Sequence, residues 1–136
     1  WHSFLNLCAV TGGALEVSGD LTRVSDHRKA RLSRTLALSD PRRSVRCLDL
    51  PMGRIVQPPS VWIAEGRTDA LVGIFNWSDQ AAEVPLQALR AAVGSLTTLE
   101  PAWPDQSRPR GSTIALPAHG SVLLRRRGRL KQATSP

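Results

Sequence analysis

The sequence is poor in cysteine and contains no long apolar run. Its two cysteines, Cys8 and Cys47, do not belong to a Cys-x-x-Cys pair. The chain therefore lacks the ligand spacing of common zinc sites and the dithiol spacing of redox enzymes, although a single Cys8–Cys47 disulfide stays open. No apolar stretch approaches the ~20 residues of a membrane-spanning helix, so we expect no membrane partner.

Lysine is also scarce, and the basic charge is carried almost entirely by arginine. The net charge is +7, and only Lys29 and Lys131 among the 18 basic residues are lysines. An arginine-rich surface can attract anions, including nucleic acids. No recognised nucleic-acid-binding motif accompanies the charge, so nucleic-acid binding is the least favoured function for this chain.

The patterns of a self-contained active site are absent from the sequence. Its three histidines, His2, His27 and His119, are far apart and show no metal-ligand spacing. There is no phosphate-binding loop, no Ser-His-Asp order and no cluster of metal-ligating residues. We therefore predict no cofactor, no metal site and no catalytic residue in this chain.

What is present at the N-terminal end is a helix-strand-helix pattern. Apolar residues over 4–10 predict the end of a buried helix, and Gly12-Gly13 predicts a turn. Residues 14–17 then predict a short buried strand, followed by a second turn and a helix. Such a unit cannot cover both faces of its strand, so residues 1–40 are predicted to be the last piece of a larger α/β domain.

The second helix is predicted from Ser25 to about Leu38. Ser25 and Asp26 supply an N-cap and an acidic first turn, and Pro41 follows the end. One face carries apolar residues and the other carries arginines that we expect in solvent. The apolar residues are Val24, Leu32 and Leu36, and the arginines are Arg28, Arg31 and Arg34.

From residue 45 onward, apolar residues no longer recur with the spacing of a helix but at every second position, as in a strand. Candidate strands are 45–50, 54–56, 61–64, 71–77, 82–86, 95–100, 112–116 and 121–126, with only a turn expected at 89–92. Short strands separated by Pro and Gly turns predict an antiparallel β-sandwich over residues 41–128. Leu71–Phe75 is apolar on both faces and is predicted to be a central strand. Residues 129–136 are predicted to form a disordered tail.

Four segments, in order, resemble the α-galactosidase (melibiase) superfamily. Gly12–Leu21 resembles the turn, last barrel strand and Ser-x-Asp-Leu turn that end the catalytic barrel in that family. Val72–Asp79 is similar to the Phe-Asn-Trp central strand of the family's C-terminal sandwich. Glu100–Trp103 and Leu116–Leu124 are similar to a later strand and to the closing Pro-Ala-His-Gly turn with its terminal strand.

The resemblance implies a retaining glycosidase built from a (β/α)8 barrel and a C-terminal β-sandwich. Retention needs two carboxyl groups about 5–5.5 Å apart. In the family both belong to earlier barrel strands, upstream of anything that matches here, so no catalytic residue is transferred to this chain. We therefore expect the C-terminal accessory portion of a larger α-galactosidase-like enzyme. Its partner would be the rest of the barrel, and its carbohydrate substrate would be bound by the whole protein.

Asp20 is the one candidate substrate-binding residue. It follows the predicted barrel strand at its carboxyl end, where active sites of such barrels lie. In a second interpretation, the Asp20 carboxylate caps a turn by accepting hydrogen bonds from backbone N–H groups. The turn sequence Ser18-Gly19-Asp20-Leu21 favours this second interpretation.

The tryptophans suggest an alternative function, a carbohydrate-binding β-sandwich module. Trp62, Trp77 and Trp103 would then stack against sugar rings. We expect Trp62 and Trp77 in the core, because they lie in or beside apolar strands. Trp103 stands between prolines and is expected to be the exposed one. If the barrel is missing, apolar residues of the helix-strand-helix unit should be exposed, namely Phe4, Leu7, Val10, Leu15 and Val17.

Overall fold

The computed structural model describes residues 1–13, 15–16, 20–49, 58–109 and 111–128. Its helices are α1 (His2–Thr11), α2 (Asp26–Leu38) and α3 (Gln87–Val93), with 3-10 turns η1 (Leu21–Arg23) and η2 (Leu96–Thr98). Its strands are β1 (Ser44–Cys47), β2 (Val61–Glu65), β3 (Asp69–Phe75), β4 (Ala82–Pro85), β5 (Glu100–Pro101), β6 (Thr113–Leu116) and β7 (Ser121–Arg127).

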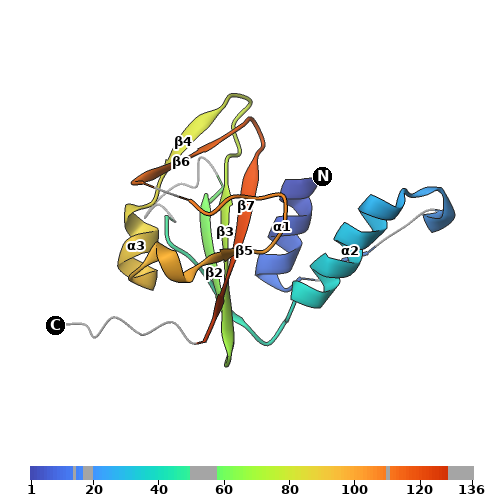
Figure 1. Cartoon of the computed structure of the whole chain (residues 1–136), viewed down its shortest axis with the longest axis horizontal. Helices are drawn as coiled ribbons and strands as arrows, with labels where there is room; N and C mark the ends of the chain where they lie inside the picture. The colour runs from blue at the N-terminus through green and yellow to red at the C-terminus, as the bar shows by residue number, and fades with distance from the viewer. Residues whose placement is uncertain (14, 17–19, 50–57, 110, 129–136) are drawn as a thin grey trace.

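The strands form two antiparallel sheets. The larger has five strands in the order β1-β2-β3-β7-β5, and the smaller pairs β4 with β6. Figure 1 shows α1 and α2 on one side of the large sheet and α3 with the β4–β6 pair on the other. The sheets are open, and the fold class is the mainly β, sandwich-like one that the sequence predicted.

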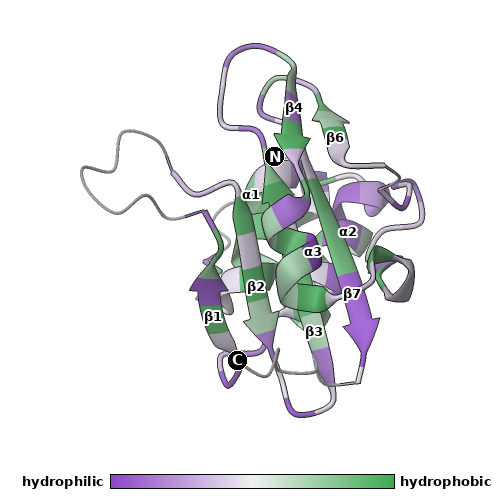
Figure 2. Ribbon diagram, turned by 90° about the vertical axis from the view of Figure 1, so that its left-hand side faces the viewer, coloured by the Kyte–Doolittle hydropathy of each residue, from purple (hydrophilic) through white to green (hydrophobic). Residues whose placement is uncertain are grey.

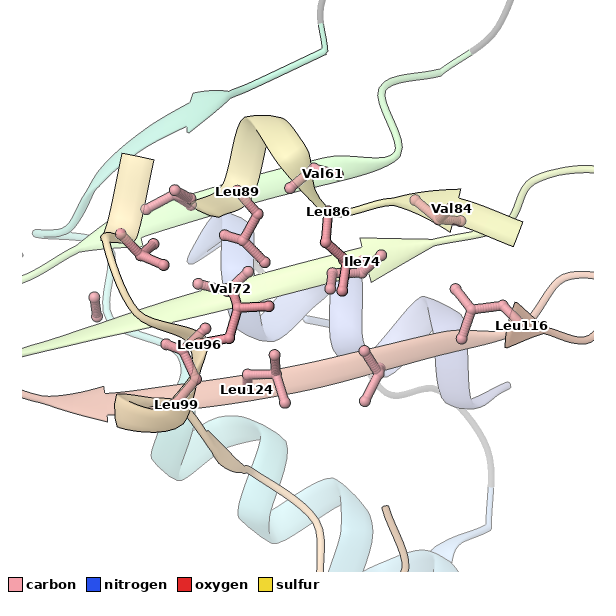
Figure 3. Close-up of a cluster of buried hydrophobic side chains, with 14 residues drawn as sticks. Val61, Val72, Ile74, Val84, Leu86, Leu89, Leu96, Leu99, Leu116 and Leu124 are labelled. Carbon is pink, nitrogen blue, oxygen red and sulfur yellow. The ribbon is translucent and has the colours of Figure 1, made fainter. Parts of the chain in front are cut away.

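β3 is the central strand and is buried along its whole length, as its apolar run indicated. Val72 and Ile74 on one face join a core that α3 and the β4–β6 pair complete, as Figure 3 shows. Leu71 and Phe75 on the other face pack against α1. In Figure 2 the green apolar stretches of β2 and β3 lie between α1 and α3. A strand covered on both faces needs apolar residues at successive positions, which explains why its sequence does not alternate.

Two predicted elements differ from the structure. Residues 95–100 form η2 and only the two-residue strand β5. The Ser95 hydroxyl accepts a hydrogen bond from the Thr97 backbone N–H at 3.3 Å, and such local bonds compete with strand pairing. The expected turn at 89–92 is part of helix α3, which buries Leu89 and Val93.

Some predictions fall on residues outside the described ones. These include the strand at 54–56, the tail at 129–136 and half of the strand at 14–17, of which Leu15 and Glu16 are described and are not in a strand. Both flanking helices are present as predicted. The division of the chain at residue 40 stays a prediction, and α1 shares one apolar core with the sheet.

The buried face of α2 is not the predicted one. Arg31, Thr35 and Leu38 are buried, whereas Leu36 is 53% exposed. The apolar pattern of the helix was misleading because the segment opposite it offers a tryptophan ring and a carboxylate, which suit arginine. On α1, Phe4 is exposed as expected, but Val10 is fully buried against the sheet.

Candidate functional site

The candidate functional site is the seam where α1 and α2 meet the sheet. Trp103, after β5, lies in it and is only 2% exposed. Its indole N–H donates to the Asn6 side-chain oxygen at 2.6 Å, and the Asn6 amide donates to the Ser121 hydroxyl at 2.8 Å. One side chain of α1 thus joins the segment after β5 to β7. The prediction that Trp103 is exposed was wrong, because its two flanking prolines say nothing of the helices that cover it.

Two arginines of α2 cover the same tryptophan. The guanidinium carbons of Arg31 and Arg34 lie 5.2 Å and 5.9 Å from the centroid of the Trp103 ring, within cation–π range. Arg31 also pairs with Asp105, and the Arg34 Nε donates to the Ala102 carbonyl at 2.8 Å. Arg31 is 7% exposed, contrary to the expectation of solvent exposure, and its charge is tolerated there because it has a carboxylate and a ring as partners.

A second ionic group holds the C-terminal end of α2. The Arg43 guanidinium donates to both Asp69 oxygens of β3, at 3.3 Å and 2.9 Å, and also to the Leu38 carbonyl at the end of α2. Arg125 of β7 approaches the same carboxylate at 3.1 Å. The forked guanidinium thus ties the helix end to the central strand. Sequence reasoning missed this group, because its members are far apart in the chain and none belongs to a motif.

Asn76 forms a third group of hydrogen bonds, in the segment that resembles the Phe-Asn-Trp strand. Its side-chain N–H2 donates to the carbonyls of Gln80 at 2.7 Å and Pro117 at 2.9 Å. Its side-chain oxygen accepts from the backbone N–H and hydroxyl of Ser78. The Ser3 hydroxyl of α1 donates to the His119 carbonyl in the neighbouring turn. Two of the resembling segments therefore meet at one buried amide, close to α1.

Asp20 takes the capping role. Its Oδ1 accepts hydrogen bonds from the Thr22 backbone N–H at 2.9 Å and from the Thr22 hydroxyl at 2.5 Å, and it caps η1. These bonds favour the charged form and hold the pKa of this exposed carboxyl below its ordinary value. A role for Asp20 in sugar binding stays a prediction.

Trp62 and Trp77 are both half-buried and converge on one carbonyl. Each indole N–H donates to the Pro59 oxygen at 2.8 Å. The Trp77 ring stacks on Phe75 with centroids 4.8 Å apart and planes 6° from parallel. Trp77 also lines a cavity of about 620 Å³ together with Glu83 and Gln87.

Both cysteines lie in the described part of the chain. Cys8 and Cys47 are free, and burial raises the pKa of each thiol. Within the described residues, no three His, Cys, Asp or Glu side chains are grouped so as to hold a metal ion. No helix among them has the length and apolar character to span a bilayer.

Solved structures with the same fold are glycosidases by description. A proposed α-N-acetylgalactosaminidase from Bacillus halodurans matches with a TM-score of 0.64 and 22% identity, over 92% of this chain and 30% of its own. The α-galactosidase I of Mortierella vinacea matches with a TM-score of 0.58 and 18% identity, over 96% of this chain and 36% of its own. A proposed α-galactosidase/melibiase from Bacteroides fragilis matches with a TM-score of 0.55 and 13% identity, over 91% of this chain and 27% of its own.

The chain resembles the C-terminal part of these glycosidases. It spans about a third of their length or less, 27–36%. No protein-family model and no curated protein sequence matches it. At these identities the likeness establishes the fold, and activity does not follow from fold alone.

Proposed function

We propose that this chain is the C-terminal accessory portion of a retaining, α-galactosidase-like glycoside hydrolase, and that it braces a catalytic (β/α)8 barrel without taking part in the chemistry. The catalytic aspartates would belong to the barrel. The structural likeness to α-galactosidases supports the class of enzyme.

The observation that carries the bracing role is the distribution of exposed apolar side chains. Within the described residues, the large exposed ones all lie on α1, η1 and α2 or at their ends. They are Trp1, Phe4, Leu21 and Leu36, each 47–58% exposed. The opposite side of these helices is fixed to the sheet by the seam. Helices that are fixed on one side and carry large exposed apolar side chains elsewhere suit a piece of barrel wall that a sandwich holds in place.

The test is an assay of the purified chain on an aryl α-galactoside. We expect no turnover above buffer, and we expect the coding sequence upstream of Trp1 to encode two aspartates at the ends of separate barrel-like strands. The proposal is wrong if the isolated chain hydrolyses the substrate and Asp20→Asn abolishes that activity with the fold intact. An unrelated domain or a stop codon upstream would also contradict it.

Bracing itself is tested in the complete protein with Arg31→Met. This substitution keeps much of the length of the side chain but removes the charge that meets Asp105 and Trp103. We expect a lower unfolding temperature with the KM for the galactoside unchanged. The matched control is Arg67→Met, at an exposed arginine of the β2–β3 turn. Equal effects of the two substitutions would contradict a specific bracing role.

A carbohydrate-binding sandwich is the second candidate, favoured by Trp77 in its cavity beside Glu83 and Gln87. If the sandwich only braces the barrel, galactosides should leave the tryptophan fluorescence of the chain unchanged. A saturable change that Trp77→Phe removes would favour the binding module instead.

A further inference from the structure

A cavity of about 490 Å³ brings together all three histidines of the chain. His2 comes from α1, His27 from the first turn of α2, and His119 from the turn between β6 and β7. Arg28 of α2 lines the same cavity. Their spacing in the sequence gave no sign of this grouping, because the helix packing that joins them is tertiary.

The lining of this cavity is basic. Besides the histidines and Arg28 it contains Trp1, two serines, Pro117, Ala118 and Gly120, but no Asp or Glu. Carboxylates around the cavity are already paired: Asp79 with His119 at 2.8 Å, Asp105 with Arg31, and Asp26, which precedes His27, with Lys29 at 3.5 Å. Among the described residues, no ion pair joins a carboxylate to His2, His27 or Arg28. When His2 and His27 are protonated, their charges and that of Arg28 have no paired carboxylate in the described part of the chain.

The surroundings of His2 disfavour its protonated form on balance. Burial lowers the pKa of His2, and the Arg31 guanidinium lowers it further, with a smaller contribution of the same sign from His27. Asp105 opposes them. A bound anion would offset the repulsion by Arg31, so anion binding and protonation of His2 should favour each other.

We propose that the cavity binds an oxyanion group, a carboxylate, sulfate or phosphate, with His2, His27 and Arg28 as its ligands. Charge-assisted hydrogen bonds from imidazolium and guanidinium groups to oxyanions are among the strongest that proteins form. The group is either a free ion or part of an acidic sugar, for which the cavity has room. This inference goes beyond the bracing function and does not rest on it.

The experiment follows the imidazole signals of the whole chain by NMR during titration with sodium sulfate, galactose 6-sulfate and galacturonate. We expect saturable shifts of His2 and His27, with affinity at least about tenfold higher near pH 5.5 than near pH 8, because imidazole charge changes between these values. The pKa of His2 should rise when the probe saturates the site. Equal affinities for sulfate and the sugars identify a free-ion site, and tighter binding of a sugar identifies an acidic-saccharide site.

Variants separate this site from general attraction to a basic protein. Arg28→Gln should weaken binding at least about tenfold, since it removes a charged ligand. Arg67→Gln removes the same charge from an exposed position elsewhere and should leave affinity within about twofold at moderate salt, where distant charges are screened. Circular dichroism checks that both variants are folded. Equal losses in the two variants, or no saturable binding of any probe, would overturn the proposal.

Discussion

At the scale of the residue, the packing of the central strand on α1 depends on the absence of one side chain. The Phe75 ring lies over Gly73, and a Cβ built on Gly73 would be 2.6 Å from Phe75 Cε2 and 3.3 Å from Val10 Cγ1. The ring therefore occupies the space that a larger residue would need. Trp77 stacks on this ring in turn. Glycine at position 73 allows the Phe75 ring and Val10 to approach the backbone closely, although glycine weakens strands in general.

Gly73→Ala should therefore lower the free energy of unfolding by about 1–3 kcal/mol, the usual cost of overpacking a core. The comparison is with Gly13→Ala, where the added Cβ meets only the Thr11 hydroxyl at 3.4 Å and should change stability little. Urea unfolding followed by tryptophan fluorescence measures both. A Gly73→Ala variant as stable as the unchanged chain would show that Phe75 and α1 can shift at no cost.

Asp40 offers a test of local electrostatics at the start of the β1 segment. Its carboxylate accepts hydrogen bonds from the Arg42 side chain and backbone, which lower its pKa from 3.8 to about 2. The native state thus binds its proton less tightly than the unfolded chain does. Its stabilising effect is complete above pH 3.8 and is lost as the pH falls toward about 2. NMR titration of the Asp40 carboxyl should give the low value, and Arg42→Ala should raise it.

At the scale of the element, α2 is held in place by ionic groups near its middle and at its C-terminal end. Arg31, near the middle of the helix, meets Trp103 and Asp105, and Arg43 joins the carbonyl of Leu38, the last residue of the helix, to Asp69 of β3. The helix buries few apolar side chains of its own. Its attachment therefore rests on these groups more than on an apolar stripe.

Asp69→Asn should lower the free energy of unfolding by about 3–5 kcal/mol, because it leaves the buried Arg43 guanidinium without its charge partner. The side chains of this pair are only 7% and 12% exposed. The matched control is Glu65→Gln, which breaks the more exposed Arg46–Glu65 pair and should cost less than about 1 kcal/mol. Thermal unfolding distinguishes the two. Similar costs would mean that water reaches Asp69 in solution.

At the scale of the whole molecule, the two sides of the helical layer differ in character. One side forms the seam with the sheet, and the other presents large apolar side chains to solvent. Under the proposed function, the rest of a barrel covers the second side. Without it, the same surface is free to contact other copies of the chain.

The isolated chain should therefore associate as its concentration rises. The double variant Phe4→Ser with Leu36→Ser should reduce association, while Ala81→Ser with Ala91→Ser, at exposed positions of the sandwich, should not. Sedimentation velocity measures the distribution of species. A chain that stays monomeric at high concentration would indicate that these side chains do not drive self-association.

Much of the fold was predictable because its signals are local. The period of two, the Pro and Gly turns and the doubly apolar run at Leu71–Phe75 predicted most strands and the central position of β3. The cap at Ser25 and the acidic Asp26 marked the start of α2. The likeness of the motifs to α-galactosidases also agrees with the solved structures of the same fold.

The sequence by itself determined most of the segments that form strands and helices, because backbone propensity and turn chemistry act between near neighbours. Tertiary structure alone decided which side of α2 is buried, that Trp103 lies inside, and that His2, His27 and His119 share a cavity. Exposure and pairing depend on what faces a side chain. Here the facing groups come from segments far away in the chain, such as Asn6 against Trp103 and Arg43 against Asp69.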